Sequence, residues 1–332
     1  MKAFEGFLIM ILTMNYIMIS NNRLFLLLFL LTALVTGCLD TPESDFDREV
    51  READEAIQLF LEANGIEAER HSSGVYIEVL EENESGRQIV RDHVVGVVYE
   101  MYHLEGDYLV DSHEDRSDPL YFSYSYDHGY NAILPAGLNY SINTMRLGEK
   151  FRFYIPSYQA YSGYSNEDFF DEYSHFIMDV EVVDLKTEEE IRELELQQVK
   201  AYAEAHEYDA HSFPNGLYHI TIEEGEGDTP QSNSRVELTF TRKYLDGTPI
   251  ESDTVNVYMN ERPFVPGFEN GVLLMKEGET AELVMPSSQA FGKSVQVLPQ
   301  GMRKDIFEVT THIPLTKPFS PVVYEVELLN VQ

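Results

Sequence analysis

Hydrophobic residues recur at helical spacing in two separate stretches of the chain. In the first stretch, the pattern ends at Asn64-Gly65, and its apolar side chains return every three or four residues. These side chains are Phe46, Val50, Ala53, Ile57, Phe60 and Leu61. In the second stretch, Thr187 and Glu190 form a capping box before the same spacing resumes. The pattern predicts two amphipathic helices, and each of them precedes a longer strand-rich stretch.

The strand-rich stretches alternate apolar with polar positions or contain short runs of β-branched residues. Six segments of this kind predict strands, at 94–99, 150–155, 176–185, 236–240, 280–285 and 322–331. Only one short helix fits inside each set, at 138–145 in the first and at 268–275 in the second. Strands grouped around a single helix are typical of the α+β class, with an antiparallel sheet wrapped on that helix.

The two strand-rich stretches also repeat each other in sequence. Gly74-Val75-Tyr76-Ile77 returns as Gly216-Leu217-Tyr218-His219, and Met145-Arg146-Leu147-Gly148-Glu149 returns as Met275-Lys276-Glu277-Gly278-Glu279. The order is kept while the spacing drifts, which indicates a duplicated domain with loop insertions and not a solenoid. The predicted segments are 1–37 as a signal peptide, 38–66 as a tether with the first helix, 67–186 as the first domain, 187–206 as a linker helix and 207–332 as the second domain.

The amino-acid composition argues against several classes of protein and of site. The 332 residues include 23 Lys and Arg against 58 Asp and Glu, a formal net charge of −35, which disfavours binding to a phosphate backbone. With 21 Tyr and 19 Phe the chain is too aromatic for a disordered protein. Cys38 is the only cysteine, which excludes an internal disulfide and a cysteine-rich zinc site. The histidines are irregularly spaced, so no metal site is predicted.

The N-terminal segment reads as an export signal. Asn21-Asn22-Arg23 precedes an apolar run at 24–35, which ends in Val35-Thr36-Gly37-Cys38. The last four residues resemble the lipobox of bacterial lipoproteins, which implies an acylated Cys38 and a lipid anchor in the bacterial cell envelope. A transmembrane helix is the alternative, but polar residues leave each apolar half short of the roughly 20 residues a span needs. Met14 or Met18 is an alternative start.

One motif set is more specific than any other feature of the chain. In the second domain it reads Phe264-Val265-Pro266-Gly267-Phe268-Glu269-Asn270-Gly271-Val272, then Met285-Pro286-Ser287-Ser288-Gln289-Ala290-Phe291-Gly292, then Val322-Val323-Tyr324-Glu325-Val326-Glu327-Leu328-Leu329. In the first domain a looser version reads Leu134-Pro135-Ala136-Gly137-Leu138 and Ile155-Pro156-Ser157-Tyr158-Gln159-Ala160-Tyr161.

These motifs resemble the FKBP-type peptidyl-prolyl cis–trans isomerase family over residues 90–185 and 234–332. The resemblance implies two FKBP-like domains of the α+β class, each with an antiparallel sheet wrapped on one short helix. An X–Pro amide resists rotation by roughly 18–20 kcal/mol. An apolar pocket with a hydrogen-bond donor lowers that barrier without a nucleophile, a metal or any other cofactor.

The resemblance implies different site residues in the two domains. In the first, the polar set consists of Tyr99, Asp111 as a buried carboxylate, Arg116 as its partner, and Tyr161 as the donor to the substrate carbonyl. The pocket floor there is altered, and its residues are Val110, Leu134, Leu138 and Met178. The loop at 162–174 carries several acidic residues, unlike the apolar rim of the family.

In the second domain the apolar floor is kept and the polar positions have changed. The floor consists of Val265, Phe268 and Tyr324. At the polar positions stand Phe240, Ile250, Glu251 and Phe291, so the donor hydroxyl is missing. The insertion at 293–320 is predicted to form a flap over this pocket.

Two functions fit these observations. The first is a membrane-anchored prolyl isomerase that assists the folding of exported proteins, with proline-containing or unfolded polypeptides as its partners. The alternative is a non-catalytic FKBP-like chaperone or adaptor. The site aromatics also fit a purely structural core, and Asp111 with Arg116 also fits a structural ion pair.

Overall fold

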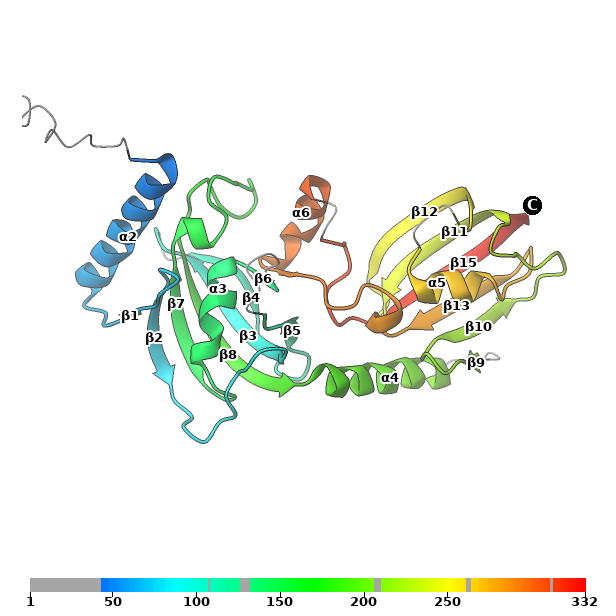
Figure 1. Cartoon of the computed structure of the whole chain (residues 1–332), viewed down its shortest axis with the longest axis horizontal. Helices are drawn as coiled ribbons and strands as arrows, with labels where there is room; N and C mark the ends of the chain where they lie inside the picture. Colours follow the sequence, from blue (N-terminus) through cyan, green and yellow to red (C-terminus); the bar gives the residue numbers. More distant parts are fainter. Residues whose placement is uncertain (1–42, 107, 126–131, 206–209, 261–263, 311–312) are drawn as a thin grey trace, which may run out of the picture. The chain divides into compact units, whose positions relative to one another are not determined.

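Two antiparallel sheets contain most of the strands of the chain (Figure 1). The structure, a computed structural model, describes residues 43–106, 108–125, 132–205, 210–260, 264–310 and 313–332. The predicted signal peptide and Cys38 lie outside these ranges. Within them, no helix combines the length and the apolar character needed to cross a bilayer. Glu49–Gln332 forms one compact unit that contains both sheets.

The two sheets have the same strand order. The first runs β4 (Leu109–His113), β3 (Val94–His103), β8 (Phe176–Lys186), β7 (Lys150–Ile155), β2 (Tyr76–Glu81) and β1 (Glu69–Arg70), with β5 (Leu120–Ser123) also on β3. The second runs β12 (Pro249–Tyr258), β11 (Arg235–Tyr244), β15 (Val322–Val331), β13 (Thr280–Met285), β10 (Tyr218–Glu223) and β9 (Ala210–Ser212). The sequence repeat therefore corresponds to a repeat of topology.

One short helix packs against each sheet, as the sequence predicts. These helices are α3 (Ala136–Ser141) and α5 (Pro266–Val272), and they bury Leu138 and Phe268 at 0% and 1% exposure. Both helices begin two residues before the predicted start. In α5 the reason is Pro266 in the first turn, where a missing backbone N–H costs nothing and the fixed φ suits a helix.

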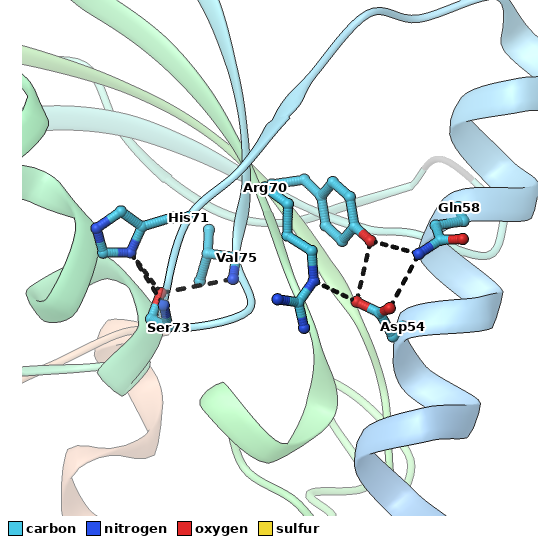
Figure 2. A network of polar contacts seen from close by, with 7 residues as sticks. Asp54, Gln58, Arg70, His71, Ser73 and Val75 are labelled. Atoms are coloured by element: carbon cyan, nitrogen blue, oxygen red, sulfur yellow. Dashed lines mark hydrogen bonds and ion pairs between the residues drawn. The ribbon is translucent and has the colours of Figure 1, made fainter.

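The helix before the first sheet is α2 (Asp45–Asn64), and a polar network ties it to β1 and β2 (Figure 2). Asp54 accepts hydrogen bonds from Arg70 Nε at 2.7 Å and from the Tyr76 hydroxyl at 2.9 Å. The Gln58 amide donates to the same hydroxyl at 2.8 Å. The buried residues of α2 are Ala53, Ile57 and Leu61. Phe46 is 61% exposed, so its predicted place on the apolar face is wrong.

The helix before the second sheet is α4 (Glu188–Ala205), and its predicted capping box is present. The Glu190 N–H donates to Thr187 Oγ1 at 3.2 Å, and the Thr187 N–H donates to Glu190 Oε2 at 2.7 Å. Two orphan backbone donors are thus satisfied at the helix start. The helix then buries Ile191, Val199 and Ala203.

Both leading helices hold the 3₁₀ turn that follows the central strand of the motif. These turns are η2 (Ser157–Gln159) and η3 (Ser287–Gln289). Glu195 of α4 accepts from the Ser287 N–H and from its hydroxyl, both at 2.8 Å, and burial raises the pKa of this carboxyl. In the first half, the Ser157 hydroxyl donates to Glu49 of α2 at 3.2 Å. The turn that leads to Tyr161 is therefore fixed from outside the sheet.

A short parallel pairing joins residues of the two halves. It is formed by β6 (Ile133–Leu134) and β14 (Gln296–Val297), and η4 (Gln300–Met302) and α6 (Arg303–Val309) follow β14. A further 3₁₀ turn, η1 (Ile142–Thr144), follows α3. The Leu134–Pro135 and Leu298–Pro299 peptide bonds are cis.

Candidate functional site

The polar centre of the first half is a hydrogen bond between two neighbouring strands. Tyr99 on β3 is 2% exposed, and its hydroxyl donates to Asp111 Oδ2 on β4 at 2.6 Å. Burial, and then the charge of Asp111, raise the pKa of Tyr99 far above its usual value. The phenol therefore stays protonated and orients the carboxylate by a short, charge-assisted bond.

Tyr161 presents the second hydroxyl of this site. Its ring stacks on Phe170 at 4.7 Å and meets Phe176 edge-on at 5.7 Å. The hydroxyl is buried and has no hydrogen-bond partner among the described residues, and burial raises the pKa of Tyr161. A buried donor without a partner costs about 1–3 kcal/mol, so this hydroxyl is available to an incoming carbonyl oxygen.

Phe170 belongs to the loop at 162–174, for which the sequence predicts no apolar rim. It is 4% exposed, and Phe169 also packs against the same core. These two side chains turn inward, while Asp168, Asp171 and Glu172 of the same loop stay exposed.

Arg116 does not pair with Asp111, so that prediction is wrong. Its guanidinium forms an ion pair with Glu181 of β8, and its side chain is 65% exposed. Successive side chains of a strand point to opposite faces. Because Met178 and Val180 of β8 are fully buried in the core, Glu181 lies on the outer face and holds Arg116 there.

The predicted pocket floor of the first half gathers around the polar pair. Leu138 and Met178 are fully buried, and Val110 and Leu134 pack against the same hydrophobic cluster as Tyr99. We call Tyr99, Asp111 and Tyr161, with this floor, the first site. The structure thus brings together every predicted residue of this site except Arg116.

Part of the insertion packs onto the first site. Its Val297, Leu298 and Met302 are buried in the first site's cluster, and the Gln300 N–H donates to Asp111 Oδ2 at 2.8 Å. The sequence predicts that the insertion covers the second pocket, whereas the structure places this part of it on the first site. Three apolar side chains within six residues need burial, and the floor of the first site provides it.

The predicted residues of the second half form an aromatic cluster. Phe268 lies 5.4 Å from Phe240 and 4.6 Å from Tyr324 between ring centroids. Val265 and Ile250 are partly buried against these rings. We call these residues, with Glu251 and Phe291, the second site.

Arg242 is a residue of the second site that the sequence reasoning missed. It is 6% exposed, forms an ion pair with Glu251 at 2.9 Å, and donates to the Tyr324 hydroxyl at 3.1 Å. Its guanidinium carbon lies 4.3 Å from the ring centroid of Phe291, within the range of a cation–π contact. In the hairpin of β11 and β12, Arg242 lies directly opposite Glu251. Pairing these two strands in the sequence would have predicted this cross-strand ion pair.

A cavity of about 680 Å³ lies away from both sites. Tyr121, Glu195, Tyr244 and Pro318 are among its lining residues, and none of the predicted site residues lines it. In the described ranges, no group of three or more His, Cys, Asp or Glu side chains is placed to hold a metal ion.

A histidine beside the first site makes its stability depend on pH. The Ser157 N–H, at the start of the turn before Tyr161, donates to His175 Nδ1 at 2.9 Å, which requires that nitrogen to be unprotonated. Burial lowers the pKa of His175 below its usual 6.5. This contribution to stability is complete above pH 6.5 and is lost as the pH falls through the lowered pKa.

We therefore expect the free energy of unfolding to fall between pH 7.5 and pH 5, and to fall less in His175→Gln. A glutamine carbonyl can accept the Ser157 N–H but does not titrate. Urea denaturation followed by circular dichroism at both pH values measures the difference. Tyr173→Phe, at a position that is 53% exposed, changes no histidine and is the control that keeps the parent pH dependence. An unchanged slope in His175→Gln contradicts this role of His175.

Comparison with known proteins finds a family match in the second half of the chain. Residues 226–329 match the family described as FKBP-type peptidyl-prolyl cis-trans isomerase. The chain is 32% identical over 123 residues to the FKBP-type 22 kDa peptidyl-prolyl cis-trans isomerase of Escherichia coli K12, a match that covers 36% of this chain and 52% of that protein. It is 30% identical over 99 residues to the peptidyl-prolyl cis-trans isomerase Mip of Chlamydia trachomatis, covering 29% and 40%. The chain thus spans about half or less of the length of these relatives.

Solved structures of the same kind match with low overall similarity. A peptidyl-prolyl cis-trans isomerase from Pseudomonas syringae has 23% identity and a TM-score of 0.34, covering 43% of this chain and 95% of its own. The three FKBP domains of wheat FKBP73 have 20% identity and a TM-score of 0.30, covering 79% and 96%.

Proposed function

Since residues 226–329 are a domain of the FKBP-type peptidyl-prolyl cis-trans isomerase family, we propose that this chain catalyses the rotation of X–Pro bonds in other polypeptides. Two FKBP-like domains, at 67–186 and 207–332, carry the two sites. Because the strand order is the same in both sheets, the proposal extends the family fold to the first half as well.

The observation that carries the proposal is the content of the first site. Leu298 and Gln300 are both held there through their backbone N–H groups, which donate to Leu134 O at 3.0 Å and to Asp111 Oδ2 at 2.8 Å. Pro299 lies between them and is buried. A site that accommodates an Xaa–Pro segment in apolar surroundings, with the Tyr161 hydroxyl unpaired beside it, has the elements that amide rotation requires.

We propose that this activity serves exported proteins at the bacterial cell envelope. The lipobox-like motif Val35-Thr36-Gly37-Cys38 supports a lipid anchor there, and a net charge of −35 keeps the body of the protein away from anionic lipid. Proline-containing or unfolded polypeptides in the adjacent space are the proposed partners.

A second candidate function is that of an adaptor without catalysis. The second site favours it, because Phe291 replaces the donor hydroxyl and the ion pair of Arg242 with Glu251 occupies the polar positions. In this candidate, the aromatic cluster grips apolar segments and rotates no bond.

A peptide isomerisation assay separates the two functions. We expect the full chain to accelerate rotation of a Leu–Pro bond in a short peptide. Without a catalyst this rotation takes tens to hundreds of seconds. Tyr161→Phe is expected to lower kcat/KM by up to about tenfold, the worth of one hydrogen bond. Tyr173→Phe, at a residue 53% exposed, is the matched control.

Two outcomes count against the proposal. If the peptide isomerises only at its spontaneous rate in the presence of the full chain and of each site variant, the chain is not an isomerase and the adaptor function is favoured. Acceleration that Tyr161→Phe does not change assigns the turnover to the second site and contradicts the role of the first.

A further inference from the structure

Residues 296–300 contact the first site in the manner of a bound peptide. We infer that this Gln-Val-Leu-Pro-Gln segment is an internal ligand of the first site, which is therefore a receptor for extended Val-Leu-Pro-Gln-like peptides held closed by the chain itself. The inference rests on the proposed function only in so far as the first site binds proline-containing segments.

Backbone hydrogen bonds anchor the segment at both ends. The Gln296 N–H donates to Ala132 O and the Leu298 N–H donates to Leu134 O, both at 3.0 Å, in the parallel pairing of β14 with β6. The Gln300 N–H then donates to Asp111 Oδ2 at 2.8 Å. Addition of an extended segment to a strand edge is a common mode of peptide recognition, in which main-chain bonds give affinity and side-chain pockets give specificity.

The side chains of the segment are also buried as those of a ligand would be. Val297 and Leu298 are 1% and 0% exposed within the first site's cluster, and Pro299 is buried between the two anchors. Past the segment, a Cβ on Gly301 would lie 2.7 Å from the ring of Phe169, so the backbone runs directly against the loop at 162–174. An apolar residue before the proline is thus part of what the site recognises.

Arg303 holds the segment in a fixed shape without touching the first site. It is 7% exposed, and its guanidinium donates to Val295 O, Pro314 O and Thr316 O at 2.6, 3.0 and 3.2 Å. These three carbonyls belong to the insertion itself. Arg303 is therefore a positioning residue, which presents residues 296–300 as a preformed extended segment.

A tethered ligand competes with any peptide that arrives from solution. When only a fraction of a protein is in the open form, the apparent affinity for an external ligand falls by that fraction. The segment has a high effective concentration because it belongs to the same chain. External peptides are expected to bind the first site only after the segment has left it.

A fluorescence anisotropy titration tests this inference. The probe is a labelled synthetic peptide with the sequence of residues 293–304, titrated with the full chain and with Leu298→Asp, whose carboxylate cannot stay in the apolar cluster. We expect Leu298→Asp to bind the probe about tenfold or more tightly than the parent chain does. Arg303→Ala is a second way to release the segment, which leaves every residue of the first site in place.

Two further chains and one altered probe complete the test. Val309→Asp changes a residue of the same insertion that is 77% exposed, and it is expected to bind the probe as weakly as the parent. Leu298→Asp with Asp111→Ala is expected to lose the gain, because the Gln300 N–H of the probe then lacks its acceptor. A probe with Leu298 replaced by Asp is expected to bind none of the chains.

Equal binding of the probe by the parent and by both released chains overturns the inference, because the segment then does not occupy the site. Absence of binding to folded Leu298→Asp and Arg303→Ala, with unchanged circular dichroism, overturns it as well. Binding without any isomerisation supports the internal ligand and contradicts the proposed catalysis, so the two failures are distinguishable.

Discussion

The Leu298→Asp chain is expected to isomerise a Leu–Pro peptide about tenfold faster than the parent chain, or more, if the internal segment fills the first site in about nine molecules of ten. In the parent chain, Asp111 Oδ2 already accepts a hydrogen bond from the Gln300 N–H at 2.8 Å. Removing the segment exposes that carboxylate, the Tyr161 hydroxyl and the apolar floor to an external proline peptide.

The measurement is kcat/KM for the two chains in the peptide assay, with Val309→Asp as the control. Adding Tyr161→Phe to Leu298→Asp identifies the site responsible and is expected to remove most of the gain. If Leu298→Asp has the parent rate while it binds the labelled peptide, the first site binds peptides without rotating them.

The Phe268→Ala chain is expected to lose about 3–5 kcal/mol of unfolding free energy, the range for truncating a large buried aromatic side chain. Phe268 is 1% exposed and contacts the rings of Phe240, Phe264 and Tyr324, at centroid distances of 5.4, 4.9 and 4.6 Å. Because these rings pack on it within the buried cluster of the second half, truncating Phe268 leaves a cavity there.

Urea denaturation followed by circular dichroism measures this loss. Leu274→Ala, at a position 43% exposed just after α5, is the control and is expected to change the free energy of unfolding by well under 1 kcal/mol. A small effect of Phe268→Ala would show that the second sheet does not depend on its aromatic cluster.

Local patterns in the sequence predict much of this fold. Apolar spacing predicts both leading helices, the Thr187–Glu190 pair predicts the capping box, and the repeat predicts that both sheets share a strand order. The family resemblance predicts that Tyr99, Asp111 and Tyr161 gather at one place. Each of these features depends on neighbours in the chain or on a motif with fixed spacing.

Contacts across long sequence distances are what the sequence does not predict. Gln300 bonds to Asp111 across 189 positions, and neither residue belongs to a pattern that marks the other. The family resemblance predicts Asp111 as the partner of Arg116, but the alternation of side chains on β8 gives it Glu181 instead. Packing in three dimensions decides such pairs, and a single sequence shows only their members.

The pairing of β6 with β14 has a consequence for the order in which the protein matures. Synthesis proceeds from the N-terminus, and N-terminal parts of a chain generally fold first. The first sheet is complete at Lys186, long before Leu298 has been made. In a newly made chain the first site is therefore open at first, and it becomes occupied only when the later-made residues 296–300 pack into it.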